Sequence, residues 1–229
     1  MMNCKFNDFE KFAVSNGIGS NKLNSYINYV NPMILEERSM NVTAIDIFSR
    51  LLYEKIIYLG TGIDADVANV VNGQLLYLKS ICDSDDEIKM YINSPGGSCI
   101  SGLAIYDTMN LIEPDVSTIC IGMAASMASI ILSSGAKGKR YALPNSRVMI
   151  HQVSTSTGYV RTADLKIEYD EAKFIQNSLY DILSKNSGKT FEEIEKDADR
   201  DHWLSPVECL PGNYGQFGLV DEVIVKEKK

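Results

Sequence analysis

The chain has 229 residues, of which 45% are hydrophobic and 23% are charged, and its formal net charge at pH 7 is −8. This length suffices for a full hydrophobic core, so we expect a single folded domain. The balance is acidic, and basic residues cluster only at the terminal Lys226, Lys228 and Lys229, which argues against binding of nucleic acid.

Neither a secretion signal nor a membrane span is expected. Residues 1–8 lack the apolar core of a signal peptide. The most apolar stretch, 118–132, is too short to cross a bilayer comfortably. The five cysteines are Cys4, Cys82, Cys99, Cys120 and Cys209. They form no CxxC pair and no cluster with histidine, so we expect no metal site and a reducing, cytoplasmic compartment.

The predicted elements begin after a polar N-terminal segment. Residues 1–40 are irregular in pattern, and we expect them to form an extension ahead of a single domain over 41–229. The short apolar run 55–60 predicts a buried strand. Asp64 can cap the helix that follows. The apolar positions of that helix share one face and are Val67, Val70, Val71, Leu75 and Leu78.

A second strand and a second helix are predicted next. Residues 88–92 alternate between apolar and polar side chains, as a half-buried strand does. The loop 93–97, Asn-Ser-Pro-Gly-Gly, separates this strand from a helix predicted over about 101–111. Pro114 cannot continue that helix, so the next element begins after it.

Two further apolar runs, 116–121 and 146–151, predict buried strands. A helix that starts at Ser126 and ends at Gly135 is expected between them. Strands that alternate with helices in this way indicate βαβ units, so the fold class is α/β with a largely parallel sheet.

The segment that follows differs in character. Residues 154–159 are polar and predict a loop or an exposed strand. A long helix is predicted over 163–185. Its apolar stripe consists of Leu165, Tyr169, Ala172, Ile175, Leu179 and Leu183. Packing against the core and contact with a neighbouring subunit both explain this stripe, and the residues alone do not decide between them.

Ser126 and His151 are the candidate catalytic pair. Ser126 follows a predicted strand and begins a helix, where a sharp turn can expose its hydroxyl beside unpaired backbone N–H groups. Imidazole is the usual base for such a serine, and the chain has two histidines. The base needs a carboxylate to orient it. The candidates between Glu195 and His202 are Asp197, Asp199 and Asp201, and the residues alone do not choose among them.

Backbone donors for an oxyanion are also present. The loop 95–97 offers N–H groups that no Cβ shields, and the N–H of Met127 lies next to the serine. Each feature alone has a structural explanation, because packed serines, strand-end histidines and Gly-Gly turns are common. Cys99 and Cys120 lie in apolar surroundings, where we expect small hydrophobic side chains and not nucleophiles.

Considered together, the segments resemble the Clp protease family, the proteolytic subunits of ATP-dependent Clp proteases. The resemblance runs from about Asp46 to Val225. It rests on residues 91–97, 102–109, 114–120, 124–127, 135–140, 143–152, 199–201 and 218–221.

The resemblance implies a role for each candidate residue. It assigns the nucleophile to Ser126, the base to His151 and the orienting carboxylate to Asp201. The oxyanion donors fall on Gly97 and Met127. His202 has no role in the family motif and is expected to be a packing or surface residue.

The resemblance also implies a fold and an assembly. The fold would be crotonase-like α/β, with a protruding handle helix and strand over about 153–186. Two stacked heptameric rings would enclose a chamber in which unfolded proteins are cut. An AAA+ unfoldase of the ClpX or ClpA/ClpC type would consume the ATP, and this subunit, which lacks a phosphate loop, would need no cofactor.

Three segments depart from the family pattern. Residues 153–158 differ from the usual proline- and glycine-containing strand, so substrate preference and ring stacking are open. The insertion 209–216 is expected to loop out close to Asp201. Residues 31–37 fit a pore-forming arm only loosely.

Two other functions are compatible with parts of the pattern. The altered segments would suit a regulatory subunit of a mixed ring that contributes little catalysis, although the complete triad argues against it. An acyl-CoA hydratase or isomerase would share the fold and the paired N–H donors, but such enzymes typically use acidic residues and not a serine nucleophile.

Overall fold

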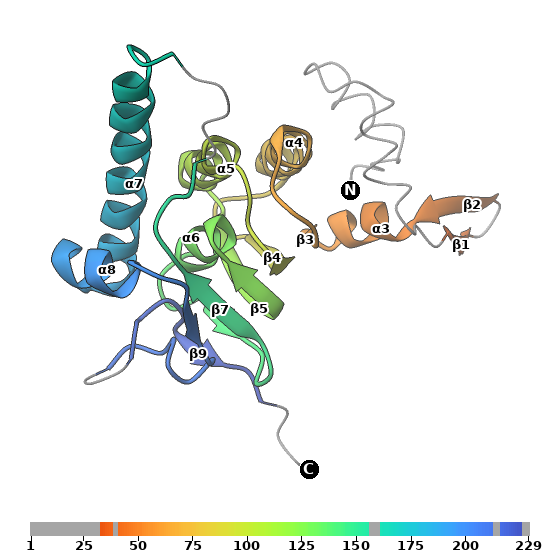
Figure 1. Ribbon diagram of the computed structural model, residues 1–229. Helices are drawn as coiled ribbons and strands as arrows, with labels where there is room; N and C mark the ends of the chain where they lie inside the picture. The colour runs from red at the N-terminus through yellow and green to blue at the C-terminus, as the bar shows by residue number, and fades with distance from the viewer. Residues whose placement is uncertain (1–32, 39–40, 156–160, 213–215, 226–229) are drawn as a thin grey trace.

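The computed structural model describes residues 33–38, 41–155, 161–212 and 216–225. A central sheet carries helices α4, α5 and α6 on it, and α7 stands to one side of this body (Figure 1). The helices are α3 (Ile47–Tyr53), α4 (Ala65–Ile81), α5 (Cys99–Leu111), α6 (Met127–Ser133), α7 (Leu165–Ser187) and α8 (Phe191–Asp197).

The sheet confirms the prediction of an α/β fold with mostly parallel strands. Its strands are β3 (Ile56–Leu59), β4 (Glu87–Ser94), β5 (Asp115–Ala125), β6 (Arg140–Ala142), β7 (Arg147–Ile150), β8 (His202–Leu204) and β9 (Glu222–Val223). The main path runs β3-β4-β5-β6-β9 with parallel pairing throughout. Strand β7 pairs in parallel with β5, and β8 pairs antiparallel with β7.

The predicted helix starts agree with the capping residues. Asp64 accepts a hydrogen bond from the N–H of Val67 over 2.8 Å, as expected for the N-cap of α4. Helix α5 begins two residues before its predicted start because Ser98 caps it, accepting from the N–H of Ser101. All five apolar positions predicted for the inner face of α4 are buried.

Strand β5 continues past its predicted end at residue 121 and reaches Ala125. The additional residues pair with β7, in the register Met123↔Arg147 to Ala125↔Met149. Strand β4 likewise includes Ser94, which was predicted to lie in the loop. In both cases pairing with a neighbouring strand extends the element beyond its apolar run.

Several short elements have no counterpart in the sequence prediction. They are the helices α3 and α8, the strands β6, β8 and β9, and the hairpin of β1 (Met33–Arg38) and β2 (Asn41–Asp46). Strands of two or three residues are too short for a periodic pattern to show. The residues predicted to form an N-terminal extension therefore include a β-strand from Met33 onward.

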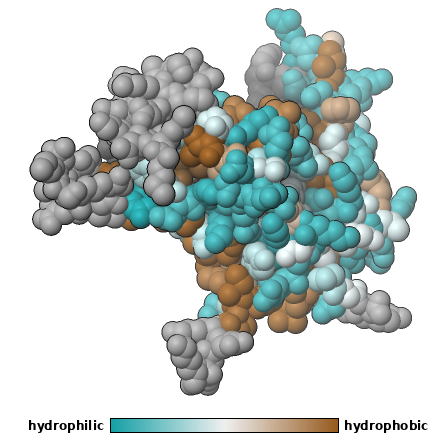
Figure 2. Space-filling model, turned by 180° about the vertical axis from the view of Figure 1, so that it is seen from behind, coloured by the Kyte–Doolittle hydropathy of each residue, from teal (hydrophilic) through white to brown (hydrophobic). Residues whose placement is uncertain are grey.

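Helix α7 divides into an inner and an outer part. Near its C-terminal end Leu179, Tyr180 and Leu183 are buried against the body. Further toward the N-terminus Tyr169 and Phe174 are 66% and 68% exposed, although both are large and apolar. Figure 2 shows apolar surface among polar surface on the projection at the upper right. Core packing thus explains only the C-terminal half of the predicted stripe.

A buried ion pair fastens the strands β6 and β9. The guanidinium of Arg140 binds Asp221 through two hydrogen bonds, Nε to Oδ2 at 2.9 Å and Nη2 to Oδ1 at 2.6 Å. The backbone N–H groups of Gly138 and Arg140 also donate to Oδ2. Burial alone would raise the pKa of Asp221, but these donors and the charge of Arg140 hold it below its usual range.

Removing this carboxylate is expected to be costly. The substitution Asp221→Asn leaves the Arg140 charge buried without its counter-ion, so the free energy of unfolding should fall by about 3 kcal/mol. Denaturant unfolding at pH 7 measures this loss. Because the folded-state pKa of Asp221 is lowered, the contribution is complete above about pH 4 and disappears as the pH falls through that pKa. The difference between the two proteins should therefore shrink in acid, and a pH-independent difference would contradict the assignment.

Candidate active site

Ser126 lies at a strained turn between β5 and α6. Its backbone has φ 55° and ψ −127°, in a region that residues with a side chain rarely adopt. The N–H of Ser126 donates to Met149 O over 2.8 Å, which fixes the turn against the end of β7. The hydroxyl makes no capping bond to α6 and is free to face the neighbouring strand. The predicted strand–serine–helix arrangement is therefore present.

His151 follows β7 and connects two other candidate residues. Its Nε2 lies 2.8 Å from Ser126 Oγ, and its Nδ1 lies 3.2 Å from Asp201 Oδ1. A carboxylate at Nδ1 accepts the proton of that nitrogen, which leaves the lone pair of Nε2 for the serine hydroxyl. This network assigns the tautomer that a general base requires.

The choice among the three aspartates follows from strand pairing. Asp201 immediately precedes β8, and the pairing Ile150↔His202 brings it beside His151. Asp197 is instead paired with Lys189 at 3.5 Å. Asp199 lies at the surface, where its carboxylate approaches Arg200. The structure thus brings Asp201, and neither of the other two, to the histidine.

The two predicted oxyanion donors line the same pocket as Ser126. Gly97 has φ 151°, and a Cβ there would meet Ile63 O at 2.2 Å, so a side chain cannot be accommodated. The N–H of Ile63 donates to Gly96 O, and Ile63 O accepts from the N–H of Ser98. Within the described parts of the chain the Gly97 N–H has no acceptor. Met127 is the first residue of α6, so its N–H also lies outside the helical hydrogen bonds.

The Pro-Gly-Gly loop fits closely against the serine turn. A Cβ on Gly96 would meet Ala125 O at 2.4 Å and both Ser126 Cβ and Met127 N at 2.8 Å. This close approach holds the loop and the start of α6 side by side. Backbone N–H groups beside a nucleophilic serine are the usual donors to an oxyanion.

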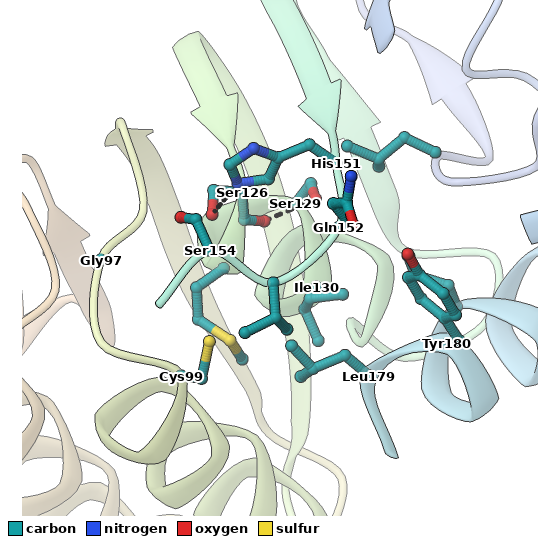
Figure 3. A pocket seen from close by; sticks show the side chains of 14 residues that line it. Gly97, Cys99, Ser126, Ser129, Ile130, His151, Gln152, Ser154, Leu179 and Tyr180 are labelled. Carbon is teal, nitrogen blue, oxygen red and sulfur yellow. Dashed lines mark hydrogen bonds between the residues drawn. The ribbon is translucent and has the colours of Figure 1, made fainter. Parts of the chain in front are cut away.

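The pocket beside the triad has a volume of about 60 Å³. Figure 3 shows His151 above Ser126, with the side chains of Ile130 and Leu179 deeper in the pocket. Cys99 also lines it, but burial raises the pKa of the Cys99 thiol, and the same holds for Cys120. Both thiols therefore stay protonated near neutral pH, as expected for structural cysteines.

Two residues of the site were missed by the sequence prediction. Ser129 donates its hydroxyl to Ser126 O over 2.7 Å and so supports the first turn of α6. Residues three apart in a helix are neighbours, so the position of Ser129 three residues after Ser126 in a predicted helix could have indicated this contact. Tyr180 reaches the pocket from α7, and nothing in its local sequence distinguishes it from a core residue.

His202 packs against Phe217, with ring centroids 5.7 Å apart and nearly perpendicular planes. The prediction that 209–216 loops out is wrong for its first residues, because Cys209 is buried in the core. The N–H of Val220 donates to Cys209 O, and the N–H of Gly218 donates to Leu210 O. Residues 213–215 of this insertion lie outside the described part of the chain, as do 156–160 of the altered segment. The His151–Asp201 contact is present beside the insertion.

Among the described residues, no group of His, Cys, Asp and Glu could hold a metal ion. The described helices are also too short or too polar to cross a membrane.

Comparison with known proteins gives consistent matches. The sequence model of the family described as Clp protease matches residues 38–227. The ATP-dependent Clp protease proteolytic subunit of Porphyromonas gingivalis is 47% identical over 229 residues, covering 97% of this chain and all of that protein. The protein of the same name from Bacteroides fragilis strain YCH46 is 47% identical, and that from Bacteroides thetaiotaomicron is 45% identical. Each of these covers 96% of this chain and 99% of the relative.

Proposed function

From the premise that this chain belongs to the Clp protease family, whose proteolytic subunits are serine peptidases, we propose that Ser126, His151 and Asp201 are its catalytic triad. The observation that supports this most strongly is the position of His151 between the other two, 2.8 Å from Ser126 Oγ and 3.2 Å from Asp201. Sequence identity alone does not require such an arrangement of side chains.

The geometry supports acyl transfer in two steps. Ser126 Oγ attacks the carbonyl carbon of the scissile peptide bond while His151 Nε2 takes its proton. The N–H groups of Gly97 and Met127 bind the oxyanion of the tetrahedral intermediate. His151 then gives its proton to the leaving amine, and an acyl-enzyme remains on Ser126. A water molecule, activated by the same histidine, releases the acid and restores the serine.

Cleavage of a short fluorogenic peptide by the purified chain tests this function. We expect turnover without added nucleotide, because a short peptide needs no unfolding before it is cut. Pretreatment with a fluorophosphonate should abolish the turnover. A homomeric preparation that is correctly assembled but inert toward both peptide and fluorophosphonate would instead indicate a regulatory subunit.

We further infer that the natural substrates are unfolded proteins delivered by an ATPase partner. The curated relatives are named ATP-dependent proteases. This proposal assigns ATP consumption to an AAA+ unfoldase of the ClpX or ClpA/ClpC type and requires no cofactor in this subunit. The four described cysteines are unpaired, which is typical of a reducing compartment such as the cytoplasm.

We propose that the outer half of α7 joins two stacked heptameric rings. The exposed apolar side chains of Ile167, Tyr169 and Phe174 support this proposal, since a solvated helix would not favour them. The substitution Tyr169→Glu should place a charge in that interface and halve the native mass measured by light scattering. Lys166→Gln, a change on the same exposed turn, should leave the mass unchanged. An undiminished mass for Tyr169→Glu would exclude this residue from the contact.

A further inference from the structure

Strand β5 changes its neighbour along its length, on the side away from β4. Residues 118–120 pair in parallel with β6, and residues 123–125 pair in parallel with β7 (Figure 1). Ser126 follows the end of β5, and His151 follows the end of β7. The last part of β5 therefore has to leave β6 and turn toward β7 before the hydroxyl of Ser126 can reach the imidazole of His151.

This change of neighbour coincides with a bulge in β5. On its other side, β5 pairs with β4 up to Cys120 and again at Ala124. Between these two pairs β4 contributes one residue, Asn93, and β5 contributes three, residues 121–123. Bulges bend a strand and increase its twist, and they are common beside active sites. The bulge thus gives β5 the bend that it needs to pass from β6 to β7.

The side chain of Asn93 replaces a strand partner at the bulge. Met123 has no partner in the pairing of β4 with β5, and its N–H donates instead to Asn93 Oδ1 over 3.2 Å. The same oxygen lies against Gly122, where a Cβ would meet it at 2.5 Å. Within the described ranges of the chain, Asn93 Nδ2 makes no hydrogen bond, so the oxygen alone connects this side chain to the bulge.

We propose, on the premise that Ser126 is the nucleophile, that Asn93 is a positioning residue whose side-chain oxygen fixes the bulge of β5. Met123 is the first residue of β5 that pairs with β7, and it lies three residues before Ser126. Without the bond from Asn93, the Met123 N–H loses its acceptor and the bulge is free to take other conformations. The Ser126 hydroxyl then spends less time at 2.8 Å from His151 Nε2, where the proton can be transferred.

Asn93→Ala removes the oxygen and is expected to lower kcat for a short fluorogenic peptide by about 10²-fold, the cost of misplacing a catalytic group by roughly 1 Å. The KM should change little, because Asn93 does not line the pocket beside Ser126. Asn93 is exposed, so alanine there leaves the core intact. Asn93→Asp keeps an oxygen that accepts from an N–H at least as strongly as an amide does, so its kcat should stay within about threefold of the wild type.

Gly122 provides a second way to break the same bond. Its φ is not positive, so Gly122→Ala adds only a Cβ, and this Cβ would push Asn93 Oδ1 away from the Met123 N–H. Gly122→Ala alone should therefore lower kcat as Asn93→Ala does. Added to Asn93→Ala, it should cause little further loss, because the oxygen that it displaces is already gone. Such non-additivity indicates one shared contact, whereas two independent losses of stability would add.

Asn110→Ala is the matched control. Asn110 is an exposed asparagine on α5 whose Nδ2 donates to Tyr106 O over 2.8 Å, so this variant also loses one amide hydrogen bond but leaves β5 untouched. Its kcat should equal that of the wild type. All variants are compared as assembled proteins of equal native mass. If Asn93→Ala does not assemble, Gly122→Ala decides alone, by the same change in kcat at constant KM.

Three results would overturn the proposal. The first is a kcat for Asn93→Ala, or for Gly122→Ala where that variant decides, within about threefold of the wild type. The second is an equal loss in Asn93→Ala and Asn93→Asp, and the third is a full additional loss when Gly122→Ala is combined with Asn93→Ala.

Labelling with a fluorophosphonate separates this proposal from the assignment of the nucleophile. If the wild type and Asn93→Ala are labelled at Ser126 at the same rate, the catalytic function stands and the role of Asn93 is refuted. If the wild-type chain is neither labelled at Ser126 nor active on the peptide, the catalytic premise and the role of Asn93 fail together.

Discussion

Ser126→Ala is expected to lower kcat for peptide hydrolysis by about 10⁶-fold, because no acyl-enzyme can form without the hydroxyl. The loss should appear almost entirely in kcat, since the pocket walls and the N–H groups of Gly97 and Met127 remain to bind the peptide. Stopped assays on a short fluorogenic peptide measure the residual rate, which needs high enzyme concentration and long incubation.

The matched control is Ser134→Ala, at the other end of α6. The Ser134 hydroxyl donates to Ile130 O, accepts a hydrogen bond from Asn186 Nδ2 and does not contact His151. This variant should retain activity within about threefold of the wild type. Activity of Ser126→Ala within tenfold of the wild type, at equal native mass, would show that another residue provides the nucleophile.

Asp201→Asn is expected to lower kcat by about 10⁴-fold. The carboxylate at 3.2 Å from His151 Nδ1 holds the proton on that nitrogen and stabilises the imidazolium that forms during the reaction. An amide can donate to Nδ1 instead, which places the proton on Nε2 and leaves no base for Ser126. Measurement of kcat against pH should show the recovery of some activity at high pH, where hydroxide can remove the serine proton directly.

Asp199→Asn is the control for this substitution, since it removes a surface carboxylate two residues earlier that makes no contact with His151. Its activity should stay within about twofold of the wild type. Equal losses in the two variants would mean that net charge near the site, and not the contact to His151, determines the rate. The Asp201 side chain is 64% exposed in the single chain, so the loss should be measured in the assembled protein.

The parts of the fold that the sequence predicted are those with long periodic patterns. The buried face of α4, its cap at Asp64 and the alternation of strands with helices were all readable from residue spacing. The short strands β6, β8 and β9 were not, because their positions depend on pairing with strands far away in the chain. The Arg140–Asp221 pair belongs to the same class, since its two residues are 81 positions apart.

In the candidate site, too, local features could be predicted from the sequence, and features that depend on the pairing of distant strands could not. The turn at Ser126 and the Gly-rich loop at 95–97 are local features, and each was predicted from neighbouring residues. The choice of Asp201 over Asp197 and Asp199 was not available from the residues themselves, because it depends on the register of β8 against β7. Family resemblance supplied that choice in the sequence analysis, and the structure supplies an independent geometric reason for it.

Mapping of a fluorophosphonate adduct by peptide mass spectrometry identifies the nucleophile directly. The assembled wild-type protein would be treated until peptide cleavage stops, then digested, and the modified residue identified. The position of His151 beside the Ser126 hydroxyl predicts a single adduct on Ser126, in proportion to the activity lost. An adduct on another residue such as Cys99, or full peptidase activity with Ser126 modified, would show that Ser126 is not the nucleophile.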